Sequence, residues 1–86
     1  MNKDRRKRLT EALALLDKAE TLLNEADQIV TEVRDEEQEA FDNLSEGLQQ
    51  SERGQLMEEA ISSLESFDVE SFLNDARESI ENAIAA

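Results

Sequence analysis

The sequence predicts an all-α protein folded as an antiparallel helical hairpin. Helix-favouring Ala, Leu and Glu dominate the chain, which has no proline and only two glycines, whereas β-branched and aromatic residues are scarce. Apolar residues also recur every seven positions over the first half of the chain, as they do in helices that pack into bundles. Since 86 residues make one small domain, we expect a single helical domain of two long helices, with a third short helix as an alternative.

The first helix is predicted over residues 4–42, where three apolar series lie side by side. The first series consists of Leu9, Leu16, Leu23 and Val30. The alanine series consists of Ala12, Ala19, Ala26 and Val33. The outer series consists of Leu15, Leu22 and Ile29. A stripe of this width suits a helix in a bundle better than the narrow seam of a two-stranded coiled coil, and the alanines allow a partner helix to approach closely.

A turn is predicted over residues 43–51. Asn43 and Gly47 are residues that commonly end helices, and Ser45 or Ser51 is suited to cap the helix that follows. The return helix is predicted over residues 52–84. Its apolar residues change phase near residues 67–69, where Asp68 is suited to cap a separate third helix. The absence of proline and glycine there favours instead a continuous helix with a local stutter.

Two helices alone leave much of these wide apolar stripes in contact with water. We therefore expect the hairpin to form a homodimer, as a four-helix bundle, or to be covered by a larger partner. The residues expected in the core or in the dimer interface are Leu9, Leu16, Leu23, Val30, Ile61, Leu64, Phe72 and Ile80.

Charge is unevenly distributed along the chain, whose net charge is −13. Five of the nine basic residues fall in the first eight positions, whereas the segment from Leu9 onward carries 21 acidic residues against four basic ones. Such a body repels nucleic acid and anionic membranes and attracts basic protein surfaces. We expect a protein partner with a basic surface, and contact with nucleic acid only through Arg5, Arg6 and Arg8.

The sequence carries no sign of a membrane segment or a secretory signal. No apolar run approaches the roughly 20 residues that span a bilayer, and Glu11 and Asp17 interrupt the apolar segment that follows the basic start. The chain also has no cysteine, which agrees with a reducing compartment. These features predict a cytoplasmic protein.

Enzyme catalysis is not expected. The chain has no histidine, cysteine, tyrosine or tryptophan, so the usual general base and most nucleophiles are missing. Neither a phosphate-binding glycine loop nor the Glu-x-x-His motif of carboxylate-bridged metal bundles is present. We therefore expect no catalytic residues, no cofactor and no metal site.

The most promising binding segment is the polar stretch at residues 34–54, which allows two interpretations. In the first, it is a plain connector in which Phe41 closes the end of the hairpin core. In the second, it is a binding surface in which an apolar anchor is surrounded by charge, an arrangement typical of protein-binding hot spots. That surface would consist of Glu36, Glu37, Glu39, Phe41 and Asp42.

Residues 33–65 read VRDEEQEAFDNLSEGLQQSERGQLMEEAISSLE. This segment resembles one that recurs in short, acidic, helical proteins of tailed phages and bacterial genomes, with the form DEEQEAFDNLPEGLQ followed by SERG. The chain departs from that form at Ser45, where the related segment has proline, so a turn initiated by proline is not implied. The resemblance implies a small helical protein of phage or bacterial type and carries no known activity.

These observations lead to a hypothesis of a phage-type accessory protein whose acidic surface occupies and inhibits a basic site on a host or defence protein. The first alternative is a structural role, as an oligomerising adaptor or assembly factor of a phage particle. The second is contact with nucleic acid through the basic N-terminus, although those cations are better explained as offsetting the acidic residues at the end of the return helix. Mimicry of DNA is disfavoured, because carboxylates at heptad spacing lie about 10 Å apart, wider than successive phosphates.

Overall fold

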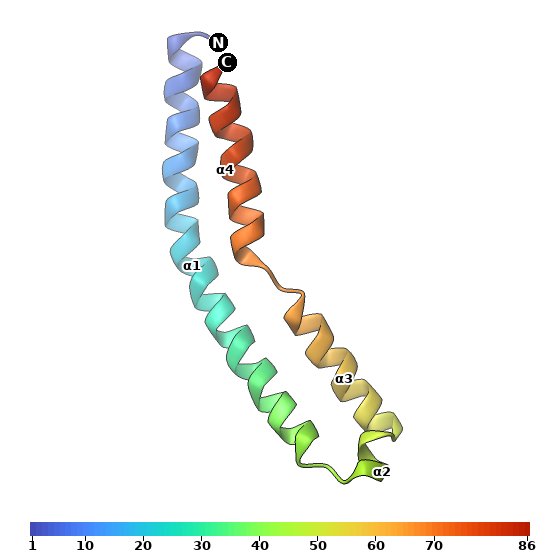
Figure 1. Cartoon of the computed structure of the whole chain (residues 1–86). Coiled ribbons are helices and arrows are strands. Elements are labelled where there is room, and N and C mark those ends of the chain that lie inside the picture. Colours follow the sequence, from blue (N-terminus) through green and yellow to red (C-terminus); the bar gives the residue numbers. More distant parts are fainter. The chain divides into compact units, whose positions relative to one another are not determined.

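The computed structural model describes all residues from Met1 to Ala86, and every regular element in it is an α-helix. In chain order the helices are α1 (Lys3–Asp42), α2 (Glu46–Gln49), α3 (Glu52–Glu65) and α4 (Val69–Ala85). The prediction of an all-α antiparallel hairpin is confirmed, with α1 as one arm and the later helices as the other (Figure 1). The return arm is divided, and the turn contains the short helix α2.

Helix α1 is uninterrupted over its 40 residues, close to the predicted range of 4–42. Asn2 precedes it and caps its first turn, because the Asn2 side-chain oxygen accepts a hydrogen bond from the Arg5 backbone N–H at 2.8 Å. At the other end, the Asn43 N–H donates to the Glu39 carbonyl at 3.1 Å, and the helix stops there. Asn43 therefore ends α1, as its position predicted.

The chain forms two compact units, and α1 contributes to both. Unit 1 comprises Met1–Glu25 and Asp68–Ala86, so that the first part of α1 lies antiparallel to α4 and the two chain termini are neighbours (Figure 1). The Arg6 Nε donates to the Ile84 carbonyl at 3.1 Å, which links the two ends directly. Val69 and Leu73 of α4 form the buried part of this unit, and Leu73 is only 3% exposed.

Unit 2 comprises Ala26–Phe67. Here the remainder of α1 runs beside α3, and α2 lies at the turn (Figure 1). The buried residues are Gly54, Met57 and Ile61 of α3, which recur at the three- and four-residue spacing of one helix face. The Gln49 side-chain amide also donates to the Phe41 carbonyl at 3.1 Å, which ties α2 to the end of α1.

Two serines cap the short helices of unit 2. The Ser45 hydroxyl accepts a hydrogen bond from the Leu48 N–H, and the Ser51 hydroxyl accepts one from the Gly54 N–H. Both serines that the sequence offered as caps therefore act as caps. The expectation that Gly47 ends a helix is wrong, because Gly47 lies inside α2 and no glycine has a positive φ.

The return arm is broken where its apolar pattern changes phase. α3 ends at Glu65, and α4 begins at Val69, so the preference for a continuous helix is wrong. The Asp68 side chain accepts a hydrogen bond from the Ser71 N–H at 3.0 Å and caps α4, while the Ser66 N–H bonds back to the Ser62 carbonyl. Hydrogen bonds on both sides of the break satisfy backbone groups that the break would otherwise leave unpaired. The break therefore needs neither proline nor glycine.

The apolar stripe of α1 is divided along its length. A row of half-buried residues, spaced alternately three and four apart, marks the face that the return arm covers. This row is Leu9, Leu13, Leu16, Glu20, Leu23, Asp27, Val30, Arg34, Glu37 and Phe41. The first series lies on this face, whereas the outer series remains in water, and no residue of α1 is fully buried.

Candidate protein-binding surfaces

The predicted acidic surface lies at the end of α1, within unit 2. Glu36, Glu39 and Asp42 are exposed, whereas Glu37 and Phe41 are half-buried. The Gln38 side-chain amide donates to the Asp42 carboxylate at 2.9 Å. The five residues thus occupy neighbouring turns of one helix, with three carboxylates facing the solvent.

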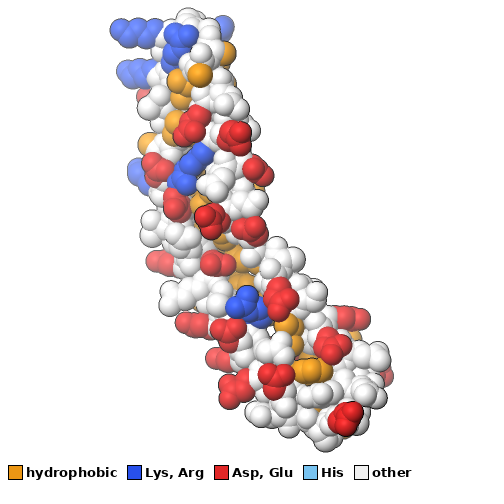
Figure 2. Space-filling view, in the orientation of Figure 1, with side chains coloured by type: hydrophobic (Ala, Val, Ile, Leu, Met, Phe, Trp, Pro, Cys, Tyr) orange, Lys and Arg blue, Asp and Glu red, His pale blue; other side chains and the backbone are white.

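Most carboxylates near this surface have no cationic partner. Arg34 pairs with Asp35 at 3.1 Å, and no ion pair involves Arg53, the other basic residue of unit 2. The space-filling view shows acidic side chains gathered over this part of the chain (Figure 2). An exposed single-sign surface of this kind attracts basic groups, and the attraction weakens as salt increases.

Phe41 is less accessible than an exposed anchor would be. Its side chain is half-buried, which favours the connector interpretation for this residue. The more exposed large apolar side chains of unit 2 are Ile29, Val33, Leu48, Leu56 and Phe67. These residues are not among those that the sequence predicts for a binding surface, although the outer series contains the signal for Ile29.

The residues predicted for the core or the dimer interface fall into three groups. Ile61 is buried. Phe72 is 63% exposed and projects from α4 of unit 1. The others are half-buried, and they are Leu9, Leu16, Leu23, Val30, Leu64 and Ile80.

Unit 1 has an ion-pair cluster that the sequence did not reveal. Arg77 of α4 donates to Asp17 at 2.9 Å and also to Glu20, both on α1. The hydrogen bond with Glu20, then that with Asp17, raises the pKa of Arg77 above its usual value. A base whose pKa is higher in the folded than in the unfolded state stabilises the fold at any pH below its unfolded-state pKa. The contribution of the Arg77 charge to stability is therefore lost only in strongly alkaline solution.

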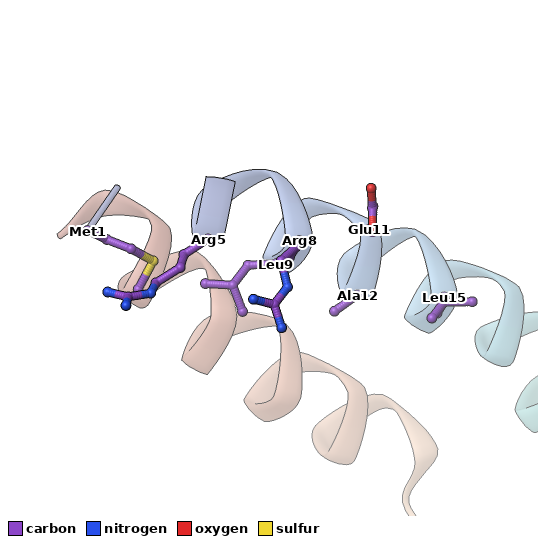
Figure 3. Close-up of a pocket in the computed structure, with 7 residues that line it drawn as sticks. All are labelled: Met1, Arg5, Arg8, Leu9, Glu11, Ala12 and Leu15. Carbon is purple, nitrogen blue, oxygen red and sulfur yellow. The ribbon is translucent and has the colours of Figure 1, made fainter. Parts of the chain in front are cut away.

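Residues at the basic N-terminus of unit 1 line a shallow groove. The groove is lined by Met1, Arg5, Arg8, Leu9, Glu11, Ala12 and Leu15, and in Figure 3 Glu11 points away from the others. Arg6 is not part of this groove, because its side chain donates to the end of α4. The three arginines proposed for nucleic-acid contact are therefore divided between two surroundings.

A second apolar face of α1 carries several of the exposed large side chains, and we name it the outer face. It consists of the alanine series and the outer series together, namely Ala12, Leu15, Ala19, Leu22, Ala26, Ile29 and Val33. Leu15, Leu22 and Ile29 are 64%, 67% and 61% exposed. The three-series stripe is wider than a single neighbouring helix covers, so the hairpin leaves the large side chains of this face in water, whereas Ala12 and Ala19 are half-buried.

No group of three or more acidic side chains is arranged to hold a metal ion. None of the helices combines the length and the apolar character that crossing a membrane requires. Comparison with protein-family models, with curated proteins and with solved structures finds no match to this chain.

Proposed function

We propose that this protein is a non-enzymatic protein-binding module, and that the outer face of α1 is the surface through which it binds. The observation that carries this proposal is the high exposure of Leu15, Leu22 and Ile29 along one face of a single helix. Large apolar side chains that are contiguous on a surface typically mark a site of protein association. In an isolated hairpin these side chains stay in water and contribute no burial to its stability.

The role that suits this surface is that of an oligomerising adaptor or assembly factor. A heptad-spaced apolar face is what helices use to pack against other helices. Binding through such a face depends on apolar contact, so it should resist salt.

The second candidate function is occupation of a basic site on another protein by the acidic surface, which would inhibit that protein. The exposed and unpaired carboxylates of Glu36, Glu39 and Asp42 support it. Binding of this kind is dominated by charge, which speeds association and is screened by salt. Its dependence on salt separates it from apolar assembly.

Salt-stepped capture from bacterial lysate tests the two candidates against each other. The tagged protein is compared with a Leu15→Ser/Leu22→Ser variant and a Glu39→Lys/Asp42→Lys variant. An assembly role predicts captured protein that persists in about 1 M salt and is lost with the serine variant. An inhibitory role predicts release at moderate salt and loss with the lysine variant.

Circular dichroism of each variant provides the control for folding. All four substituted positions are exposed, so the helix content should stay at the wild-type level. A wild-type protein that captures nothing at low salt and is monomeric at all concentrations would contradict the proposed function.

A further inference from the structure

The outer face of α1 has a regular alternation of small and large side chains. From Ala12 to Val33 its residues are spaced alternately three and four apart, and in order they read Ala, Leu, Ala, Leu, Ala, Ile, Val. All of them belong to one uninterrupted helix, so their alignment along its face follows from helix geometry alone. The face is therefore a complete heptad seam for which the chain supplies no partner.

Antiparallel pairing of two such seams brings each small residue opposite a large one. With the twofold axis between residues 20 and 21, Ala19 faces Leu22 of the second copy. In the same alignment Leu15 faces Ala26, and Ala12 faces Ile29. Alternating small and large residues across facing positions lets two helices interdigitate at close range. A parallel, in-register pairing would instead place alanine on alanine and leucine on leucine.

Arg5 and Glu36 at the two ends of the seam favour the same arrangement, in which Arg8 faces Val33. The spacing continues to Arg8 and Arg5 at the N-terminal end and to Glu36 at the C-terminal end. Arg5 and Arg8 lie on the side of α1 that carries Ala12 and Leu15 (Figure 3). In the antiparallel alignment Arg5 faces Glu36 of the second copy, whereas a parallel alignment would bring arginine against arginine and glutamate against glutamate.

Phe72 provides a separate indication within unit 1. Arg77 projects from one flank of the buried face of α4 and reaches Asp17 and Glu20, which fixes that flank against the polar side of α1. Helical geometry places Phe72 on the opposite flank of α4. The exposed Phe72 ring therefore lies on the same side of unit 1 as the outer face, where it extends the apolar surface.

We propose that two copies of this chain associate antiparallel through the outer faces of α1, with Ala12 opposite Ile29 and Arg5 opposite Glu36. This inference rests on the proposed function and specifies its first partner as a second copy. The interface is isologous, as in most homodimers. It leaves the acidic residues at positions 39 and 42 outside the seam.

Cysteine trapping tests the orientation and the register directly, because the chain has no cysteine of its own. An Ala12→Cys chain is mixed with a larger, tagged Ile29→Cys chain and oxidised. The expected product is the mixed disulfide dimer, with little dimer from Ala12→Cys alone, since the two position-12 residues lie far apart. The matched control is Gln28→Cys, which is exposed on α1 but lies off the seam.

Three results of this experiment would overturn the proposal. Self-linked Ala12→Cys dimers as the main product would show parallel pairing. A mixed product with tagged Leu22→Cys in preference to Ile29→Cys would show a register shifted by one heptad. Cross-linking with Gln28→Cys at the same yield as with Ile29→Cys would show that the outer face is not the contact.

Charge exchange provides an independent test that needs no cysteine. Arg5→Glu should raise the dimer dissociation constant about fivefold to tenfold at low salt, and Arg5→Glu/Glu36→Arg should restore it. Arg53→Glu, which lies on α3 and is not a seam residue, is the control and should leave the constant unchanged. Equal effects of Arg5→Glu and the double exchange would contradict the pairing.

Failure of this inference is distinguishable from failure of the proposed function. A monomeric wild-type chain that still captures another protein through Leu15 and Leu22 would exclude the second copy while preserving the binding module. A monomeric chain that captures nothing would remove both.

Discussion

Gly54 shows how one residue permits the connection between α2 and α3. No glycine in the chain has a positive φ, so the requirement at this position concerns space and not backbone conformation. A Cβ at Gly54 would overlap the Gln49 carbonyl and lie 2.7 Å from the Leu48 carbonyl oxygen. Because these neighbours are backbone atoms, they cannot move aside as the end of a flexible side chain would.

Replacing Gly54 with alanine should therefore destabilise the protein. Crowding of a packed position typically costs about 1–3 kcal/mol, and it should exceed the gain of about 0.5–1 kcal/mol that alanine brings to a helix. Urea denaturation measures the free energy of unfolding. Gly47→Ala is the matched control, since nothing lies within 4 Å of its added Cβ, and it should be neutral or stabilising. Equal stability of the two variants would contradict this account of Gly54.

The two glycines also show the limit of prediction at the residue scale. The sequence predicts that Gly47 ends a helix, because glycine is frequent at helix ends. The crowding at Gly54 is not predictable from the sequence, because it comes from the backbone around α2, a four-residue helix that no apolar period reveals. Glu36, Glu39 and Asp42 were easier to place, since their exposure follows from the solvated side of α1, whereas Glu37 is half-buried. The half-burial of Phe41 depends on tertiary packing, which local sequence does not determine.

Among the elements, α1 was the most predictable. Its regular apolar spacing gave both its type and its bounds to within one residue at either end. The return arm was less predictable, because the same phase change is consistent with a stutter or with a break. Whether the arm breaks depends on whether Asp68 adopts an extended conformation and caps α4. The apolar pattern does not report the free-energy difference between the broken and the continuous helix.

The cap at Asp68 leads to a prediction for α4. Asp68→Ala removes the acceptor for the Ser71 N–H and should lower the stability of unit 1 by about 1 kcal/mol. Asp68→Asn keeps an acceptor and should be close to wild type. Thermal unfolding followed by circular dichroism measures the difference, with exposed Asp75→Ala as the control. If the Asp68→Ala variant unfolds at the same temperature as the Asp75→Ala variant, the cap does not determine where α4 begins.

At the scale of the whole molecule, the width of the α1 stripe explains both the fold and the proposed binding. The sequence predicted that two helices would leave apolar surface in water, and the structure shows which series stays exposed. The first series packs within the hairpin, whereas the outer series does not. Sequence alone could not make this assignment, because both series are apolar and lie only about 100° apart around the helix. Which series is covered depends on where the return arm packs, and the contact of Arg77 with Glu20 is part of that packing.

Sedimentation equilibrium of the wild-type chain at micromolar concentration tests the central claim most directly. Association through the outer face predicts a mass of twice 9.7 kDa, and the Leu15→Ser/Leu22→Ser variant should return to a single 9.7 kDa species with unchanged helix content. A wild-type chain that sediments at 9.7 kDa at every concentration would contradict self-association through α1.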